Sequence, residues 1–148
     1  MRIRFATLED APAIASLSSQ LGYPADSVEV AGFQAQVLQH PDHIVFVAES
    51  HEGTVCGWVH VFLSRRLFLP PFAELGGMVV DKGHRSSGIG GALMARAEDW
   101  AAECGCSIFR IRSSTIRTGA HKFYERMGYT ASKSQQVFDK SLSGLRHA

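Results

Sequence analysis

The sequence predicts a single α/β domain built on a mixed β-sheet, and three observations support this class. The chain has 148 residues, the size of one ordinary domain with its own core. Strand-like and helix-like patterns alternate along it in the order β-α-α-β-β-β-α-β-α-β. At its centre a strand, a glycine-rich turn, an amphipathic helix and another strand form a βαβ crossover. We therefore expect one domain of residues 1–148 with a mostly antiparallel sheet and helices on both faces.

The first half of the chain predicts a short strand, two helices and a hairpin. Ile3–Ala6 alternates apolar and polar residues as a strand does, and an apolar helical stripe follows it. After a Gly-Tyr-Pro break, a second helix spans Asp26–Gln39 and ends before a proline. The runs His43–Glu49 and Thr54–Leu63 are rich in β-branched and aromatic residues, and a short polar turn joins them.

The middle of the chain predicts a loop, a strand and the clearest helix. Arg65–Phe72 contains a double proline and predicts a loop, and Ala73–Val80 predicts a third long strand. The Gly76-Gly77 pair inside this strand indicates a bulge or a close approach of the backbone. From Ile89 onward, apolar residues recur with helical spacing until Gly105 ends the helix.

The last part predicts a strand, a short helix and a β tail. Ser107–Ser114 alternates Ile108, Arg110 and Arg112 along a strand. Residues 119–128 form a helix with one apolar face and a terminal glycine, and residues 129–142 supply one or two further strands.

Composition excludes several classes of protein. The formal net charge is +1, which argues against a nucleic-acid or membrane-surface binder. No apolar run approaches the roughly 20 residues of a membrane span, and the N-terminus turns polar too early for a signal peptide. Three cysteines without a secretory signal indicate reduced thiols in a cytoplasmic protein. The seven histidines lack the spacing of metal ligands, so we expect no metal site.

The segment "DKGHRSSGIGGALM" (Asp81–Met94) joins the third long strand to the clearest helix. The first N–H groups of a helix lack intrahelical partners and lie at the positive end of its dipole, so a glycine-rich start there can bind phosphate. It is not a P-loop, because Ile89-Gly90 replaces the lysine and the Ser/Thr. It also departs from the dinucleotide fingerprint, because Leu93 stands where the third glycine belongs.

Residues 85–90, "RSSGIG", instead match [Q/R]xxGx[G/A], and in this respect the chain resembles the GCN5-related N-acetyltransferase (GNAT) superfamily. "AHKFYERMGY" (Ala120–Tyr129) is similar to the second signature of that family, in which a helix carries a tyrosine shortly before a glycine. The resemblance extends over essentially the whole chain. It implies a sheet splayed between the strand that ends near Val80 and the strand near Ile108 to Ser113.

The resemblance implies an enzyme that transfers an acetyl group from acetyl-CoA to a primary amine by direct attack in a ternary complex. Backbone N–H groups from Ser86 to Gly91 would hold the pyrophosphate with Arg85 beside it, and the strand before the loop would pair with the pantetheine arm. The implied cofactor-binding residues are Met78, Val79, Val80, Arg85, Ser86, Ser87, Gly88, Ile89, Gly90, Gly91 and Arg117. Arg117 replaces an asparagine found in many members, and Arg117 with Arg110 or Arg112 either reaches a CoA phosphate or is an exposed charge.

The resemblance also implies two catalytic residues. Tyr124 stands at the family's position for the acid that protonates the departing thiolate, although its helical stripe equally suits a core tyrosine. Glu74 is the candidate base and a substrate contact, or else a carboxylate at a solvated strand end. His60 and His121 are weaker candidates for the base. A backbone N–H near Met78 or Val79 would hold the oxyanion.

The acceptor pocket implied by the resemblance is built from Tyr23 and its neighbours, the Arg65–Phe72 segment and residues 132–136. We expect a small-molecule amine as the acceptor. A protein amino group and a non-catalytic CoA-binding module remain the alternatives, and a homodimer is compatible with the sequence. Arg65 and Arg66 could attract an anionic amine or could be a solvated pair.

Overall fold

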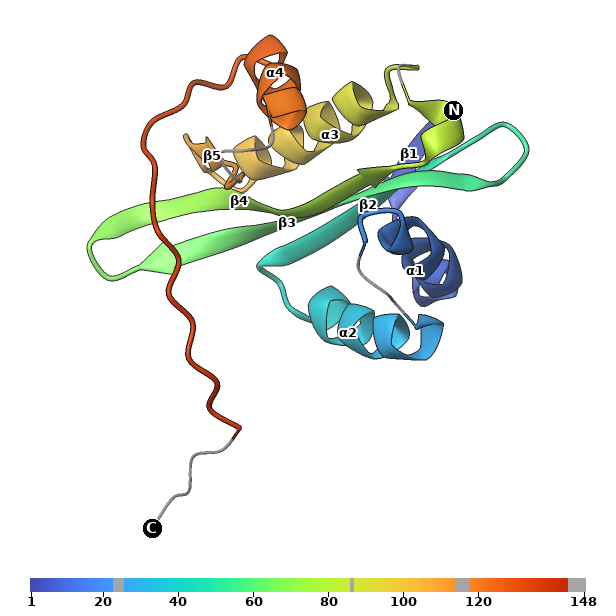
Figure 1. Cartoon of the computed structure of the whole chain (residues 1–148), viewed down its shortest axis with the longest axis horizontal. Coiled ribbons are helices and arrows are strands. Elements are labelled where there is room, and N and C mark those ends of the chain that lie inside the picture. Colours follow the sequence, from blue (N-terminus) through green and yellow to red (C-terminus); the bar gives the residue numbers. More distant parts are fainter. Residues whose placement is uncertain (23–25, 86, 114–117, 144–148) are drawn as a thin grey trace. The chain divides into compact units, whose positions relative to one another are not determined.

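The structure is a computed structural model that describes residues 1–22, 26–85, 87–113 and 118–143 (Figure 1). The chain divides into two compact units, Met1–Arg112 and Ser113–Ala148. The organisation of residues 1–148 as one domain therefore stays a prediction.

The first unit contains a five-stranded sheet with the order β1-β2-β3-β4-β5. Its strands are β1 (Arg2–Phe5), β2 (His43–Glu49), β3 (Val55–Arg66), β4 (Leu69–Val80) and β5 (Phe109–Arg110). Strands β1 to β4 pair with their neighbours in antiparallel fashion, whereas β5 runs parallel to β4. The mixed, mostly antiparallel sheet with a βαβ crossover is confirmed.

Helices cover both faces of this sheet, as predicted. Figure 1 shows α3 (Ile89–Glu103) on one side, and α1 (Ala11–Ser19) and α2 (Ser27–Gln39) on the other. We call these two sides the α3 face and the α1–α2 face. Asp26 caps α2 by accepting a hydrogen bond from the Val28 amide at 2.9 Å, and Gly105 follows α3 in the left-handed conformation with φ 86°.

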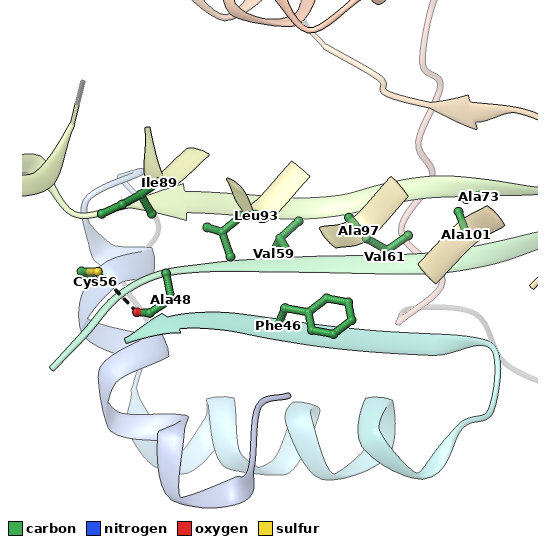
Figure 2. Close-up of a cluster of buried hydrophobic side chains, with 10 residues drawn as sticks. All are labelled: Phe46, Ala48, Cys56, Val59, Val61, Ala73, Ile89, Leu93, Ala97 and Ala101. Carbon is green, nitrogen blue, oxygen red and sulfur yellow. Dashed lines mark hydrogen bonds between the residues drawn. The ribbon is translucent and has the colours of Figure 1, made fainter. Parts of the chain in front are cut away.

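The α3 face carries the larger hydrophobic core (Figure 2). Side chains from one stripe of α3 pack on residues of β2, β3 and β4 that alternate toward it. The buried members are Phe46, Ala48, Cys56, Val59, Val61, Ala73, Ile89, Leu93, Ala97 and Ala101. Within this core the Cys56 thiol donates to the Ala48 carbonyl at 3.3 Å, and burial raises the pKa of that thiol. This packing holds the start of α3 firmly at the end of β4.

The predicted loop at Arg65–Phe72 is wrong, because β3 and β4 extend through it as a hairpin. Ser64 pairs with Phe72 and Arg66 pairs with Leu69, so two residues on β4 oppose one on β3. Pro70 and Pro71 together oppose Arg65, so β4 carries one extra residue here. Prolines are tolerated at bulges because the missing N–H groups are not needed for the ladder.

The bulge predicted at Gly76-Gly77 is confirmed. His60 pairs with Gly77, whereas the next residue, Val61, pairs with Leu75, so Gly76 is the extra residue on β4. A β-bulge bends the strand that carries it. The bulge follows directly after the two residues of β4 that pair with β5, namely Ala73 and Glu74.

The predicted strand at Ser107–Ser114 is reduced to Phe109–Arg110, and Ser114 lies outside the described residues. The pairing of β4 with β5 ends at Glu74, two residues before the bulge at Gly76. The described strands place no partner on this edge of β4 from Leu75 to Val80. The predicted splay between these strands is thus present.

The second unit contains α4 (Thr118–Arg126), as predicted, and an extended tail. Gly128 stops the helix in the left-handed conformation with φ 95°. The prediction of strands at 129–142 is wrong for the part of the tail that the structure describes. Its apolar pair, Val137 and Phe138, is adjacent in sequence and therefore cannot form one buried face of a strand.

Candidate active site

The start of α3 presents backbone amides that no side chain caps among the residues that the structure describes. Gly88 is the N-cap residue and has a left-handed backbone with φ 84°, a conformation that glycine adopts without strain. No side chain in the described part of the chain accepts a hydrogen bond at this cap, and the first turn contains no acidic residue. The Ile89 side chain is buried in the core of the α3 face. The first amides of α3 therefore remain available for an anion, as a phosphate site requires.

The turn between β4 and α3 is fixed by hydrogen bonds centred on Asp81. Its carboxylate accepts from Gln20 Nε2 at 2.9 Å, from His84 Nδ1 at 2.9 Å and from the Gly83 amide at 3.2 Å. These bonds, first among them the one from Gln20, lower the pKa of Asp81. Gln20 also accepts from the Lys82 amide at 3.0 Å, which ties the turn to the end of α1. We call this set of residues the Asp81 cluster.

The predicted loop residues flank the same turn. Arg85 is exposed and its Nε lies 3.4 Å from the Val80 carbonyl, at the end of β4. The Ser87 hydroxyl donates to the His84 carbonyl. Met78, Val79 and Val80 lie on the stretch of β4 whose outer edge no described strand covers. The structure thus brings together the strand edge and the helix start that the sequence predicted as one cofactor site.

Glu74 is a buried carboxylate on β4, not a residue at a solvated strand end. It is 7% exposed, and Arg112 donates to its Oε1 from Nη2 at 2.9 Å and from Nε at 3.3 Å. Within the described part of the chain, Oε2 accepts no hydrogen bond from the protein. Glu74 pairs with Phe62 on β3 and with Arg110 on β5. Because directly paired residues lie on the same face of a sheet, all three side chains belong to the α1–α2 face.

The arginines of the β5 segment make contacts within the first unit. Arg112 bonds to Glu74, and the Arg110 guanidinium lies 4.4 Å from the centroid of the Phe72 ring, a cation–π geometry. Arg65 donates to Asp42 at 2.8 and 3.0 Å. The sequence left two interpretations open for these arginines, contact with an anion or an exposed charge. The structure describes a partner within the protein for each of Arg65, Arg110 and Arg112.

Two histidines share a hydrogen bond on the same face. His43 Nδ1 and His60 Nε2 are 2.9 Å apart, and the two rings stack with centroids separated by 5.2 Å. Burial lowers the pKa of His60 to about 4 and also lowers the pKa of His43. Both rings are therefore neutral near pH 7, and a pKa of about 4 makes His60 a weak proton acceptor, so it does not suit the role of general base.

Tyr124 lies on α4, in the second unit. Its ring is half-buried and makes edge contacts with Phe123 and Tyr129, at centroid distances of 5.5 and 6.3 Å. These contacts agree with the apolar stripe predicted for α4. His121 lies on the same helix. Three other predicted site residues, Tyr23, Ser86 and Arg117, lie outside the described residues.

Sequence analysis missed two contacts of this site. The Glu74–Arg112 pair joins residues 38 apart in the chain, and the Gln20–Asp81 bond joins residues 61 apart. The alternation of arginines in the Ser107–Ser114 segment was a signal for the first contact. Nothing in the sequence indicated the second.

The structure shows neither a membrane helix nor a metal site in the residues that it describes. None of the helices described is both long and apolar enough to cross a bilayer. No group of three His, Cys, Asp or Glu side chains among those residues could hold a metal ion.

Comparison with known proteins identifies the family. The profile of the Acetyltransferase (GNAT) family matches residues 9–129, and the chain belongs to this family. It is an acetyl-CoA-dependent N-acetyltransferase, as the loop at the start of α3 predicted. An aminoalkylphosphonate N-acetyltransferase of Salmonella typhimurium is 29% identical over 146 residues, covering 95% of this chain and 90% of the relative.

Solved structures confirm the fold. The aminoglycoside 6'-N-acetyltransferase AAC(6')-Ih of Acinetobacter baumannii superposes with a TM-score of 0.84 at 17% identity, over 95% of this chain and 97% of that one. The aminoglycoside N-acetyltransferase AAC(6')-Iy, solved in complex with CoA, has a TM-score of 0.80 at 19% identity, over 95% of this chain and 99% of that one.

Proposed function

We propose that this protein transfers the acetyl group of acetyl-CoA to the primary amine of a small molecule by direct attack within a ternary complex. The observation that carries the proposal is the buried Glu74 carboxylate. It lies on the strand that runs directly to the uncapped start of α3. The relative and the structural neighbours support a small acceptor, because their names specify aminoalkylphosphonates and aminoglycosides.

The cofactor end of the site is proposed to work through the backbone. Amides from Ser86 to Gly91 bind the pyrophosphate at the positive end of the α3 dipole, and Arg85 adds a charge beside it. The open edge of β4 at Met78, Val79 and Val80 pairs with the pantetheine arm as an added strand would. Arg117 is proposed to contact a CoA phosphate.

The chemical step is proposed to use Glu74 and Tyr124. Glu74 accepts a proton from the ammonium group of the acceptor, directly or through a water, so that the amine nitrogen can attack the thioester carbon. Arg112 holds Oε1 and leaves Oε2 for this transfer. An N–H of Met78 or Val79 stabilises the oxyanion, the carbon–sulfur bond breaks, and Tyr124 donates a proton to the leaving thiolate. Tyr23 is proposed to contact the acceptor.

An assay of thiol release from acetyl-CoA with a panel of primary amines tests the proposal. We expect Tyr124→Phe to lower kcat by roughly 10²–10⁴-fold with little change in the KM for acetyl-CoA, because the hydroxyl acts on the leaving group. We expect Glu74→Gln to lower kcat/KM for the amine, because an amide cannot accept the proton of the ammonium group. Tyr129→Phe is the matched control, since its ring lies beside Tyr124, and it should retain activity.

Three results would contradict the proposal in different ways. Full activity of Tyr124→Phe would exclude the tyrosine as the acid. Tight CoA binding without turnover of any amine would indicate a binding module. Acetylation restricted to peptide amines would indicate a protein acceptor.

A further inference from the structure

A cavity of about 180 Å³ lies on the α1–α2 face, between the two helices and the sheet. Its apolar walls are Ile14 from α1, Val30, Phe33 and Val37 from α2, Val45 from β2 and Trp58 from β3. Phe33 is 62% exposed and forms part of the rim. Protein interiors are normally close-packed, and a cavity of about 150 Å³ is known to hold a benzene ring. The space is therefore large enough for one ring-sized group.

Among the residues that the structure describes, none of those that line this cavity is charged. Its polar lining residues are Ser18, Gln34 and His60. The Ser18 hydroxyl donates to the Ile14 carbonyl at 2.6 Å, and His60 is neutral because burial lowers its pKa to about 4. An anionic group would lose its hydration there without gaining a cationic partner, which is costly. The lining therefore selects against phosphonate and carboxylate groups.

Two lining residues contain polar atoms that lack a partner. Trp58 Nε1 and Gln34 Oε1 are buried and make no hydrogen bond within the described part of the chain. Gln34 is held by its other amide atom, since Nε2 donates to the Thr7 carbonyl at 2.6 Å. Buried polar atoms without partners are rare in native proteins and often mark a missing water or ligand. One donor and one acceptor thus occur on residues of the same cavity.

The glycine pair of β4 makes room for two of the cavity's rings. A Cβ atom at Gly76 would lie 2.3 Å from His60 Nδ1, and one at Gly77 would lie 2.9 Å from the Trp58 ring. Any other residue at these positions would force the rings to move. The bulge therefore positions His60 and Trp58, in addition to bending β4.

The cavity lies on the same sheet face as Glu74. His60 and Phe62 are two residues apart on β3, so their side chains point to one face, and Phe62 pairs directly with Glu74. Diagonal neighbours on a sheet face are about 7–8 Å apart. An amine at Glu74 could therefore extend a short chain toward the cavity.

We infer that this cavity binds the non-reacting part of the acceptor, and that the acceptor is a primary amine carrying an uncharged, ring-sized apolar group. The inference rests on the proposed function and narrows its substrate class. It also separates this chain from its relative, whose name specifies an anionic aminoalkylphosphonate.

The experiment measures binding of 2-(4-fluorophenyl)ethylamine by ¹⁹F NMR, with coenzyme A present and no acetyl donor. Val37→Phe fills the cavity from α2, and Val28→Phe is its matched control, because Val28 lies on the same helix, is 77% exposed and does not line the cavity. We expect the affinity to fall at least about tenfold in Val37→Phe and less than about twofold in Val28→Phe. Phe33→Ala, at an exposed position, should weaken binding severalfold and covers the case in which Val37→Phe does not fold.

Binding decides the inference, and turnover of the same amine decides the proposed function. The inference is overturned if the fluorinated amine does not bind, if Phe33→Ala and Val37→Phe bind it as wild type does, or if 2-aminoethylphosphonate binds more tightly in a ³¹P titration. Binding that is lost in the two cavity variants supports the inference even where thiol release shows no acetylation. Loss of binding in both cavity variants together with no acetylation would refute the proposed function and leave the inference intact.

Discussion

The two faces of the sheet are packed differently, and each kind of packing suits what lies on that face. Among the described residues, ten buried side chains on the α3 face form one continuous core against the helix whose start is the predicted phosphate site. The described residues of the α1–α2 face form a smaller buried cluster of Ala6, Ile14, Val45 and Val47, and a cavity lies beside it. A rigid core holds the amides that we propose bind the cofactor, whereas the loosely filled face leaves the space that we propose for the acceptor. Four predictions test this contrast.

The largest effect is expected on the α3 face. Leu93 is fully buried, so Leu93→Ala leaves a cavity and should lower the free energy of unfolding by about 2–5 kcal/mol. Leu38→Ala is the control, since Leu38 is only partly buried beside the cluster of the α1–α2 face, and it should cost less than half as much. Urea denaturation measures both. Equal losses would show that the two faces are packed alike.

The second largest effect is expected at the Gly76 bulge of β4, which lies against His60 on the α1–α2 face. Gly76→Ala places a Cβ atom against the His60 ring and should destabilise the protein by about 1–3 kcal/mol. The double variant Gly76→Ala/His60→Ala should recover part of this loss, because the clash is with the ring. Gly32→Ala in α2, where a Cβ meets no atom within 4 Å, should be neutral or stabilising. An additive double variant would disprove the clash.

The pH dependence of stability should depend on the same ring. The pKa of His60 is lowered from 6.5 to about 4 by burial, so between these values the unfolded chain binds the proton and the folded chain does not. Stability is lost as the pH falls through this window, on the order of 1–2 kcal/mol between pH 7 and pH 5. His60→Phe should show a shallower acid loss. An NMR titration of His60 with a midpoint near 6.5 would contradict this assignment.

The smallest effect is expected at Gln20, where the end of α1 contacts the turn before α3. Gln20 links the end of α1 to Asp81 and to the Lys82 amide, so Gln20→Ala removes two hydrogen bonds from the turn before α3. We expect the KM for acetyl-CoA to rise about three- to tenfold with kcat nearly unchanged, since the turn is proposed to position the cofactor and not the acceptor. Gln36→Ala, at an exposed position of α2, is the control. A fall in kcat with constant KM would place Gln20 in a different role.

Features that depend only on residues adjacent in the sequence could be predicted from it. The strand, Gly88 and the start of α3 could be predicted as a phosphate site because helix amides lack partners wherever a helix begins, whatever surrounds it. The two long helices, α2 and α3, followed in the same way from helical periodicity and stop signals. The hairpin around Pro70 was missed because a proline is tolerated at a bulge, and only the pairing with β3 creates that bulge.

The sequence by itself therefore determined the fold class and the family resemblance and predicted a cofactor loop, because each depends on local spacing and backbone chemistry. Only the tertiary structure decided that Glu74 is buried against Arg112, that Gln20 reaches Asp81, and that a neutral cavity lies beside His60. These features join residues that are far apart in the chain, and their geometry exists only once the sheet has brought the strands into register.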